Sequence, residues 1–288
     1  MLYRPLGVRD MRTQIRRVAA TARDADITFS RVDHPVVSIV IPAFNNWELT
    51  RRCLASVSLY APPDGAEVIL VDDSSSDETA LLSGAIPGLR TVRLAANSGF
   101  THAANSGARA ARATYTFFLN NDTLLLPGCL EALLRAMEDR SIGAVGARLV
   151  YPTGWLQEVG SLVRADGTGV HRGWGRSPAD ARVLGRTDVD YCSAAALMVR
   201  SAALREAGYF DERFSPAYYE DVDLCFTLRA QGLRVVVEPA ATVVHWEGMT
   251  HGTELRKGTS SAHTKRSQEI NRLMFMEKWH EHAAARPA

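Results

Sequence analysis

The sequence has few cysteines, and they are far apart. Cys53, Cys129, Cys192 and Cys225 are scattered through 288 residues without a C-x-x-C pair. This spacing argues against a zinc site or a dithiol redox centre. We expect the four residues to be buried as small hydrophobic side chains, in a reducing compartment.

Net charge and long hydrophobic runs are also nearly absent. The formal charge is +1 at pH 7, which argues against nucleic-acid binding driven by a basic surface, so no nucleic-acid partner is expected. No run approaches the roughly 20 apolar residues that span a bilayer, and no charged-then-apolar signal peptide opens the chain. These features predict a cytoplasmic protein.

The first 35 residues differ in composition from the rest. A short helix is expected around residues 12–22, and Pro35 marks the boundary of the segment. Two interpretations stay open: a surface helix packed on the main domain, or a basic face against anionic lipid head groups, giving peripheral association with the inner face of the membrane. The arginines that outnumber the acids here are Arg4, Arg9, Arg12, Arg16, Arg17, Arg23 and Arg31.

Short β-branched runs then alternate with helical patterns. Residues 36–42, 67–71, 91–94 and 114–119 read as buried strands, and Pro42 is expected to end the first. Residues 49–57, 101–113 and 130–137 have helical periodicity, with Asn45 or Asn46 as a cap for the first, and the serines and acids at 74–78 signal another helix start. This alternation predicts an α/β fold with a mostly parallel sheet flanked by helices.

The second half of the chain is less regular. Between residues 144 and 189 the signal weakens, and the turn at 164–167 suggests antiparallel hairpins as a small addition to the sheet. Strands are expected at 190–199, 234–237 and 241–245. Helices are expected at 201–207, from 218 to Gly232, and at 267–282.

Polar side chains follow the expected strands. Asn120 and Asp122 come after the strand at 114–119, and as residues i and i+2 of an extended end they would present two oxygen ligands together for a hard cation. Asp72 and Asp73 close the strand at 67–71. They form either a solvated turn or a site in which a carboxylate accepts a pyrimidine imide N–H while Phe44 stacks. Ligands bind at this carboxyl edge in open α/β sheets.

Two further groups allow two interpretations each. Glu220, Asp221 and Asp223 form an acidic cluster at a helix start, which either stabilises the helix dipole or supplies a general base. His245 ends an apolar strand, where a histidine is either a core residue bonded to backbone or a metal ligand.

Six strings taken together resemble the family 2 inverting glycosyltransferases with the GT-A fold. They are VSIVIPAFN at 37–45, DDS at 72–74, NSGF at 97–100, NNDT at 120–123, ED at 220–221 and VVH at 243–245. The resemblance covers residues 36 to about 250, which we expect to form the GT-A domain. Residues 1–35 would be an extension, and residues 251–288 a loop and helix packed on the domain.

The resemblance implies an activity. A sugar would pass with inversion from a UDP- or dTDP-linked donor to a hydroxyl of a saccharide or lipid-linked acceptor, in cell-surface polysaccharide synthesis. The NNDT form is similar to that of rhamnosyltransferases. Asp221 would be the catalytic base, and Glu220 would hold the loop or contact the acceptor.

The resemblance also implies ligand-binding residues. Asp122 and His245 would bind Mg²⁺ or Mn²⁺ together with Asn120, which replaces the first aspartate of the D-x-D motif and removes one negative charge. In the DD pair the second residue, Asp73, is the favoured contact to the base. The nucleotide-sugar site would comprise Pro42, Ala43, Phe44, Asn45, Asp72, Asp73, Asn97, Gly99, Asn120 and Asn121.

Two rival functions are weighed against this one. A nucleotide-sugar-binding module that has lost catalysis is favoured by Asn120 and opposed by the retained Glu220, Asp221 and His245. A nucleotidyltransferase would need a Gly-rich, basic phosphate loop after the first strand, which residues 43–46 lack. The loop at 247–253 is expected to close over the donor, with Lys257, Lys265 and Arg266 reaching the diphosphate.

Overall fold

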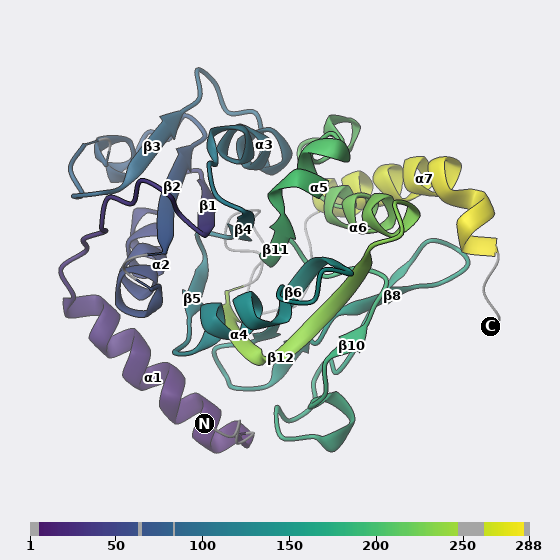
Figure 1. Ribbon diagram of the computed structural model, residues 1–288, viewed down its shortest axis with the longest axis horizontal. Helices are drawn as coiled ribbons and strands as arrows, with labels where there is room; N and C mark the ends of the chain where they lie inside the picture. The colour runs from purple at the N-terminus through teal and green to yellow at the C-terminus, as the bar shows by residue number, and fades with distance from the viewer. Residues whose placement is uncertain (1–5, 63–64, 83, 247–261, 285–288) are drawn as a thin grey trace.

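A single large sheet forms the centre of the protein, with helices on both faces (Figure 1). The computed structural model describes residues 6–62, 65–82, 84–246 and 262–284. The strands are β1 (Val37–Ala43), β2 (Ala66–Asp72), β3 (Arg90–Arg93), β4 (Tyr115–Leu119), β5 (Thr123–Leu125), β6 (Ile142–Val150), β7 (Leu156–Glu158), β8 (Ser161–Val163), β9 (Gly169–His171), β10 (Thr187–Asp188), β11 (Ala196–Arg200) and β12 (Arg234–His245). The helices are α1 (Val8–Asp24), α2 (Trp47–Tyr60), α3 (Phe100–Ala110), α4 (Cys129–Ala136), α5 (Ser201–Glu206), α6 (Glu220–Ala230) and α7 (Ala262–Ala284), with short 3-10 turns η1 (Glu78–Leu81), η2 (Ala181–Val183) and η3 (Glu212–Phe214).

The sheet is mostly parallel, as the sequence predicts. Its order is β10-β12-β6-β11-β4-β1-β2-β3, with β5 attached to β12 and β7 to β6. β1 pairs in parallel with both β2 and β4, and β12 pairs in parallel with β6. The antiparallel strand β11 joins the two parallel groups, and β8 and β9 form a separate hairpin around the turn at 164–167.

Alternate side chains of the central strands pack into two hydrophobic layers, one on each face of the sheet. In β1, Ile39 and Ile41 pack toward α2 and α4, whereas Val40 packs toward α3. The small residues of α3 allow the close approach that the sequence suggested, since a Cβ on Gly107 would lie 2.3 Å from Cγ1 of Val40. The four cysteines are free and buried. The core therefore consists of two layers, one on each face of the sheet.

Helix α1 packs on the main body beside α2 (Figure 1). It extends beyond the expected 12–22, and its inner face buries Met11, Ile15, Val18 and Ala22. The Arg51 guanidinium of α2 donates to the carbonyl of Ala22 at 3.4 Å. One face of α1 is thus packed on the main body, which leaves most of its other residues exposed. Across the described ranges, no helix has both the length and the apolar content that a bilayer crossing requires.

Several expectations from the sequence were wrong in detail. The region from 144 is not only hairpins, because the nine-residue strand β6 runs through the middle of the sheet. The strands expected at 234–237 and 241–245 are one strand, β12, with a register shift between Glu238 and Thr242. The helix expected after the serines at 74–76 is only the 3-10 turn η1, and Pro42 lies inside β1.

The cap expected for α2 was also wrong. Asn46 adopts a left-handed conformation, and its side chain accepts no capping hydrogen bond. The backbone N–H of Trp47 donates instead to Oδ2 of Asp77 at 2.9 Å. The start of α2 is thus fixed by the loop after β2, which a local reading of the sequence does not reveal.

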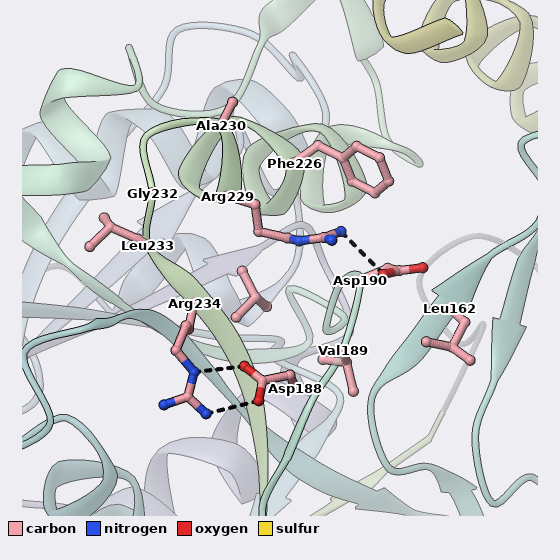
Figure 2. Close-up of a pocket in the computed structure, with 11 residues that line it drawn as sticks. Leu162, Asp188, Val189, Asp190, Phe226, Arg229, Ala230, Gly232, Leu233 and Arg234 are labelled. Carbon is pink, nitrogen blue, oxygen red and sulfur yellow. Dashed lines mark hydrogen bonds and ion pairs between the residues drawn. The ribbon is translucent and has the colours of Figure 1, made fainter. Parts of the chain in front are cut away.

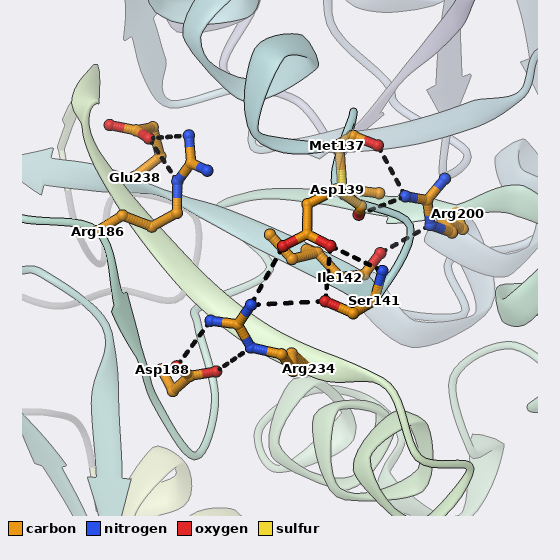
Figure 3. A network of polar contacts seen from close by, with 9 residues as sticks. All are labelled: Met137, Asp139, Ser141, Ile142, Arg186, Asp188, Arg200, Arg234 and Glu238. Carbon is orange, nitrogen blue, oxygen red and sulfur yellow. Dashed lines mark hydrogen bonds and ion pairs between the residues drawn. The ribbon is translucent and has the colours of Figure 1, made fainter.

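The edge of the sheet away from the carboxyl ends of the parallel strands is closed by arginines (Figure 3). Arg234, at the start of β12, forms ion pairs with Asp188 at 2.8 Å and Asp139 at 3.2 Å. Arg200, at the end of β11, donates to the carbonyls of Met137 and Ile142, both at 2.7 Å. At this edge the arginine side chains are consequently paired with carboxylates or bound to backbone carbonyls. The cleft lies at the opposite edge of the sheet.

Candidate active site

A cleft of about 1520 Å³ lies at the carboxyl ends of β1, β2, β4 and β12. Its walls come from both the parallel strands and the segments before α6. The structure therefore brings together side chains from distant parts of the chain. The residues predicted from the sequence that line it are Pro42, Ala43, Phe44, Asp73, Asn97, Gly99, Asn120, Asn121, Asp122, Glu220, Asp221 and His245.

Asp73 lines the cleft just after the end of β2. Its Oδ1 and Oδ2 accept the backbone N–H groups of Ser98 and Gly99, both at 2.8 Å. Burial raises the pKa of Asp73, and these two N–H groups oppose the rise. Each carboxylate oxygen keeps a second lone pair, so Asp73 can position the turn at 97–99 and still accept from a ligand.

Two residues proposed for the nucleotide site lie outside the lining of the cleft. Asp72 forms an ion pair with Arg93 of β3, and its Oδ1 accepts the N–H of Ser75 at 2.8 Å. Oδ1 of Asn45 accepts the N–H of Ser76 at 2.8 Å. Both side chains therefore bind residues of the loop after β2, and neither lines the cleft.

Asp122 and His245 lie next to each other in the lining of the cleft. β5 and β12 pair so that Thr123 lies opposite His245, which sets Oδ1 of Asp122 3.3 Å from Nε2 of His245. Both side chains are buried. The other ring nitrogen of His245, Nδ1, lies 3.1 Å from Oε1 of Gln157. An amide oxygen only accepts hydrogen bonds, so Nδ1 is the donor of this contact.

The expected extended arrangement of Asn120 and Asp122 was wrong. β4 ends at Leu119, and residues 120–122 form a turn that reverses the chain into β5, closed by the Thr123 hydroxyl donating to the Asn120 carbonyl at 2.6 Å. Both residues nevertheless line the cleft, because the turn itself lies at the sheet edge.

The donor atoms here fit a hard divalent cation in part. The side-chain oxygen Oδ1 of Asn120 is buried and accepts no hydrogen bond within the described ranges, and Asp122 and His245 add a carboxylate and an imidazole. Among the described residues, no three His, Cys, Asp or Glu side chains gather closely enough to hold a metal on their own. Any cation here would need further ligands from the substrate.

Asp221 is a half-buried carboxylate at the start of α6. Its Oδ2 accepts the N–H of Ala194 at 3.1 Å and its Oδ1 that of Val222 at 2.8 Å. Burial, with a further contribution from the charge of Glu158, raises the pKa of Asp221 to about 6. Burial next to Asp221 raises the pKa of Glu220 well above its usual range. With a pKa of about 6, Asp221 is largely ionised at neutral pH, which suits it for accepting a proton.

The loop before α6 is held in an unusual backbone conformation. Tyr218 and Tyr219 have φ values of 78° and 72°, a left-handed region that bulky residues rarely adopt. The Asn271 side chain of α7 donates to the carbonyls of Ala217 at 3.0 Å and Tyr218 at 2.8 Å, and the Tyr219 hydroxyl donates to the Gly167 carbonyl at 2.8 Å. These contacts fix the point at which Asp221 enters the cleft.

Several lining residues were missed by the sequence analysis. Glu158 is buried at the end of β7 and pairs with His171 at 2.9 Å, while its Oε1 accepts the N–H of Ser193 at 3.2 Å. Trp174 is 67% exposed and donates through its indole N–H to the Tyr151 hydroxyl at 3.3 Å. Only the Gly and Trp content of the segment signalled these residues, because their place in the cleft depends on long-range strand pairing.

The basic residues proposed to reach the diphosphate separate into three cases. Lys265 lines the cleft, and Arg266 is exposed and does not line it. Lys257 and the loop at 247–253 lie outside the described residues. Asp223, the third acid of the cluster, accepts hydrogen bonds from Trp279 at 2.7 Å and Lys278 at 2.8 Å, so it holds α7 to α6.

A second, smaller hollow of about 550 Å³ lies between α6 and β12 (Figure 2). Its charged groups are paired with one another: Arg229 with Asp190 at 3.1 Å, and Arg234 with Asp188 at 2.8 Å. None of the residues predicted for chemistry lines it. The large cleft is therefore the candidate active site.

The fold and the cleft together define a class of protein, the GT-A glycosyltransferases. The crystal structure of GalNAc-T7 with UDP, GalNAc and Mn²⁺ superposes with a TM-score of 0.66 at 15% sequence identity, covering 86% of this chain and 48% of that chain. At this identity the likeness concerns the fold.

The chain belongs to glycosyl transferase family 2, whose family model matches residues 38–205. Pre-mycofactocin glycosyltransferase of Mycobacterium tuberculosis is 32% identical over 230 residues, covering 77% of this chain and 44% of the relative. This chain thus spans less than half of that relative's length. N-acetylglucosaminyl-diphospho-decaprenol L-rhamnosyltransferase of Mycobacterium tuberculosis is 29% identical over 246 residues, covering 76% of this chain and 78% of the relative.

Proposed function

We propose that the protein transfers a sugar from a UDP- or dTDP-linked donor to an acceptor hydroxyl, with inversion at the anomeric carbon. The observation that carries this proposal is one cleft lined both by Asp221, which two backbone N–H groups hold in place, and by the Asp122 and His245 pair. Inversion by direct displacement needs one base aimed at the acceptor and a separate place for the leaving diphosphate. A single cleft offers both.

In this mechanism the chain's own residues bind, orient and move one proton. Phe44 and Asp73 bind the nucleotide base, with the backbone around Gly99 closing that end of the cleft. Asp221 takes the proton from the acceptor hydroxyl as the new glycosidic bond forms and the bond to the diphosphate breaks. Burial and the neighbouring charge of Asp221 raise the pKa of Glu220, which disfavours a second negative charge beside the base.

The leaving group is expected to lie toward Asp122 and His245. Mg²⁺ or Mn²⁺ held there with Asn120 and the donor diphosphate would offset the negative charge that grows on the departing diphosphate. The buried Asn120 oxygen supports this proposal, as does the Mn²⁺ in the GalNAc-T7 complex. With Asn in place of a first aspartate, cation binding should rely on the nucleotide more than usual.

The acceptor is proposed to be lipid-linked. Support comes from the rhamnosyltransferase relative, whose name specifies a diphospho-decaprenol acceptor and of which this chain spans 78%. Rhamnose from a dTDP-linked donor is accordingly the first sugar to test. A role in cell-surface polysaccharide synthesis at the cytoplasmic face of the membrane follows from such an acceptor.

The rival function is a nucleotide-sugar-binding module without catalysis, which Asn120 favours. The two functions differ in whether nucleoside diphosphate is released from the donor in a metal-dependent way. A panel of UDP- and dTDP-sugars, assayed with and without Mn²⁺, would separate them. Donor binding without any release, across the panel and with polyprenyl-linked acceptor present, would favour the binding module.

Two substitutions test the assigned roles. Asp221→Asn removes the base but keeps a hydrogen-bond acceptor, so the rate should fall by about 10²- to 10⁴-fold while calorimetric donor binding stays within about twofold of wild type. Asp122→Ala should weaken donor binding measured with Mn²⁺ more than binding measured without it.

The exposed Asp33→Asn is the matched control and should change neither the rate nor donor binding. Equal loss of binding and turnover in Asp221→Asn would contradict its role as base.

A further inference from the structure

Four arginines form a stripe along α1. At about 100° per residue, Arg9, Arg12, Arg16 and Arg23 project within an arc of about 60°. The arc is turned about 120° from the buried residues of the same helix, so the stripe faces solvent along one flank. All four side chains belong to exposed residues. We call these four residues the arginine stripe.

The stripe has no internal charge partner. The two acids of α1, Asp10 and Asp24, project on the other flank by the same geometry. Within the described ranges, no ion pair or hydrogen bond involves a side chain of the stripe, whereas arginines such as Arg93 and Arg234 elsewhere are paired with carboxylates. In a chain of net charge +1, the stripe is thus a local concentration of positive charge.

The stripe adjoins the rim of the cleft. The turn before β7 packs against α1 so closely that a Cβ on Gly154 would lie 2.7 Å from the Val8 carbonyl oxygen and 3.2 Å from the backbone nitrogen of Arg12. Residues 151–153 of this turn line the cleft. The next residue, Trp155, is 46% exposed. An exposed aromatic residue thus directly follows the glycine that packs against Arg12, in the turn whose first residues line the cleft.

We propose that the arginine stripe and Trp155 dock on an anionic lipid bilayer and so hold the cleft rim at the membrane surface. Arginines are attracted to the negative surface potential of anionic lipids, and tryptophan favours the interface between head groups and acyl chains. The combination suits a bilayer better than a duplex nucleic acid, because Trp155 would find an apolar layer to enter only in the former. The docking geometry deepens the proposed function by presenting a lipid-linked acceptor to the cleft.

Sedimentation with vesicles tests this proposal without donor or acceptor. The full chain should bind vesicles of phosphatidylglycerol and phosphatidylcholine in equal parts, but not vesicles of phosphatidylcholine alone, and the binding should weaken as salt rises. Because each basic residue near such a surface contributes about fivefold, Arg12→Glu combined with Arg16→Glu should lower the partition coefficient by at least about 20-fold. Trp155→Ser should weaken binding by several-fold without changing the salt dependence.

The matched control carries the same change of charge elsewhere. Arg140→Glu combined with Arg205→Glu alters two exposed arginines outside α1 and should leave vesicle binding within about twofold of wild type. Circular dichroism melting checks that both double variants fold. Calorimetry with UDP, which should be unchanged in all variants, separates failure of docking from failure of the proposed function.

Three results would overturn the proposal. They are equal binding to both kinds of vesicle, no binding of wild type to anionic vesicles, and equal loss in the control. A duplex DNA oligonucleotide that competes the protein off the vesicles at equal phosphate concentration would assign the stripe to nucleic acid instead.

Discussion

Asp221 owes its proposed chemistry to its surroundings. Burial raises its pKa to about 6, and the nearby carboxylate of Glu158 adds to the rise. A base must be ionised to accept a proton, so the rate should fall as pH drops through about 6. Asp221 ionises above that pH, which keeps it both competent and basic at neutral pH.

Glu158 can therefore be tested through the pH profile. Glu158→Gln removes a negative charge near Asp221 but keeps an oxygen that can accept the Ser193 N–H. The pKa of Asp221 should fall, so the acidic limb of the kcat/KM profile should move to lower pH. The measurement is that profile with a saturating divalent cation. The exposed Glu138→Gln is the control and should leave the limb in place. A limb that stays, or moves to higher pH, would refute this influence.

Single residues were predictable where local sequence carries the chemistry. Asp122, Asp221 and His245 stand out because each follows an apolar strand or begins a helix, and the structure lines the cleft with all three. The roles of Asp72 and Glu158 were not predictable. The partner of Asp72, Arg93, lies on another strand, and Glu158 reaches Asp221 only through the pairing of β6 with β7.

Helix α7 reaches into the site from the side. The Asn271 side chain donates to the carbonyls of Phe214, Ala217 and Tyr218, so one amide fixes the loop that leads to Asp221. Figure 1 shows α7 lying along the same side of the protein as α5 and α6. The helix thus holds the loop that leads to Asp221, the proposed base.

Asn271→Ala should loosen that loop. It leaves three carbonyls without their donor, which should lower the free energy of unfolding by about 1–3 kcal/mol and kcat by about 10- to 100-fold, since small displacements of a catalytic group are costly. Calorimetric binding of UDP should change little, because the residues proposed to bind the nucleotide belong to other segments. Leu273→Ala, an exposed change on the same helix, is the control. Unchanged turnover in Asn271→Ala would remove α7 from the mechanism.

Helices and strands were predicted well where apolar residues recur at regular spacing. They were predicted poorly where a glycine allows two segments to pack closely. β6 contains Gly143 and Gly146, which resemble turn residues in the sequence. In the structure a Cβ on Gly146 would lie 2.4 Å from Cβ of Cys192. Gly146 therefore lets the segment around Cys192 pack against β6, and it forms no turn. The irregular register between Glu238 and Thr242 likewise made one strand look like two.

The stability of the protein depends on one buried carboxylate that joins several elements. Oε1 of Glu67 in β2 accepts from the Ser38 hydroxyl at 2.6 Å and from the Arg112 backbone N–H at 2.9 Å, and its Oε2 pairs with the Arg90 and Arg112 guanidinium groups. Burial alone would raise the pKa of Glu67, but the hydrogen bonds from Ser38, Arg112 and Arg90 outweigh it and lower the pKa below 4.5.

Glu67→Ala should lower the free energy of unfolding by about 2–3 kcal/mol at neutral pH, because it leaves buried donors unpaired. A carboxylate with a lowered folded-state pKa stabilises the protein above its unfolded pKa and loses that contribution as pH falls through the folded value. The difference between wild type and variant should therefore shrink in acid. Urea titrations at neutral pH and below pH 4 measure it, with Glu138→Ala as the exposed control. A difference independent of pH would show that the charge of Glu67 is not responsible.

The general architecture followed from the sequence because alternating strands and helices permit few arrangements. The polar residues at the strand ends also indicated which edge of the sheet carries the cleft, since parallel strands point their carboxyl ends the same way. What the sequence could not reveal is which loops cross that edge. The turn at 151–155 meets both α1 and the cleft through contacts between segments more than a hundred residues apart.

The residues that line the cleft come from two separate parts of the chain. Phe44, Asp73 and Asp122 are encoded before the stretch that supplies Asp221 and its supports, and the family match at 38–205 stops short of Asp221 and His245. The Asp122 and His245 pair nevertheless joins the two halves of the chain, because its members lie 3.3 Å apart although 123 positions separate them. An exchange of either half with a relative would keep one member of this pair and replace the other, so the two halves have to change together.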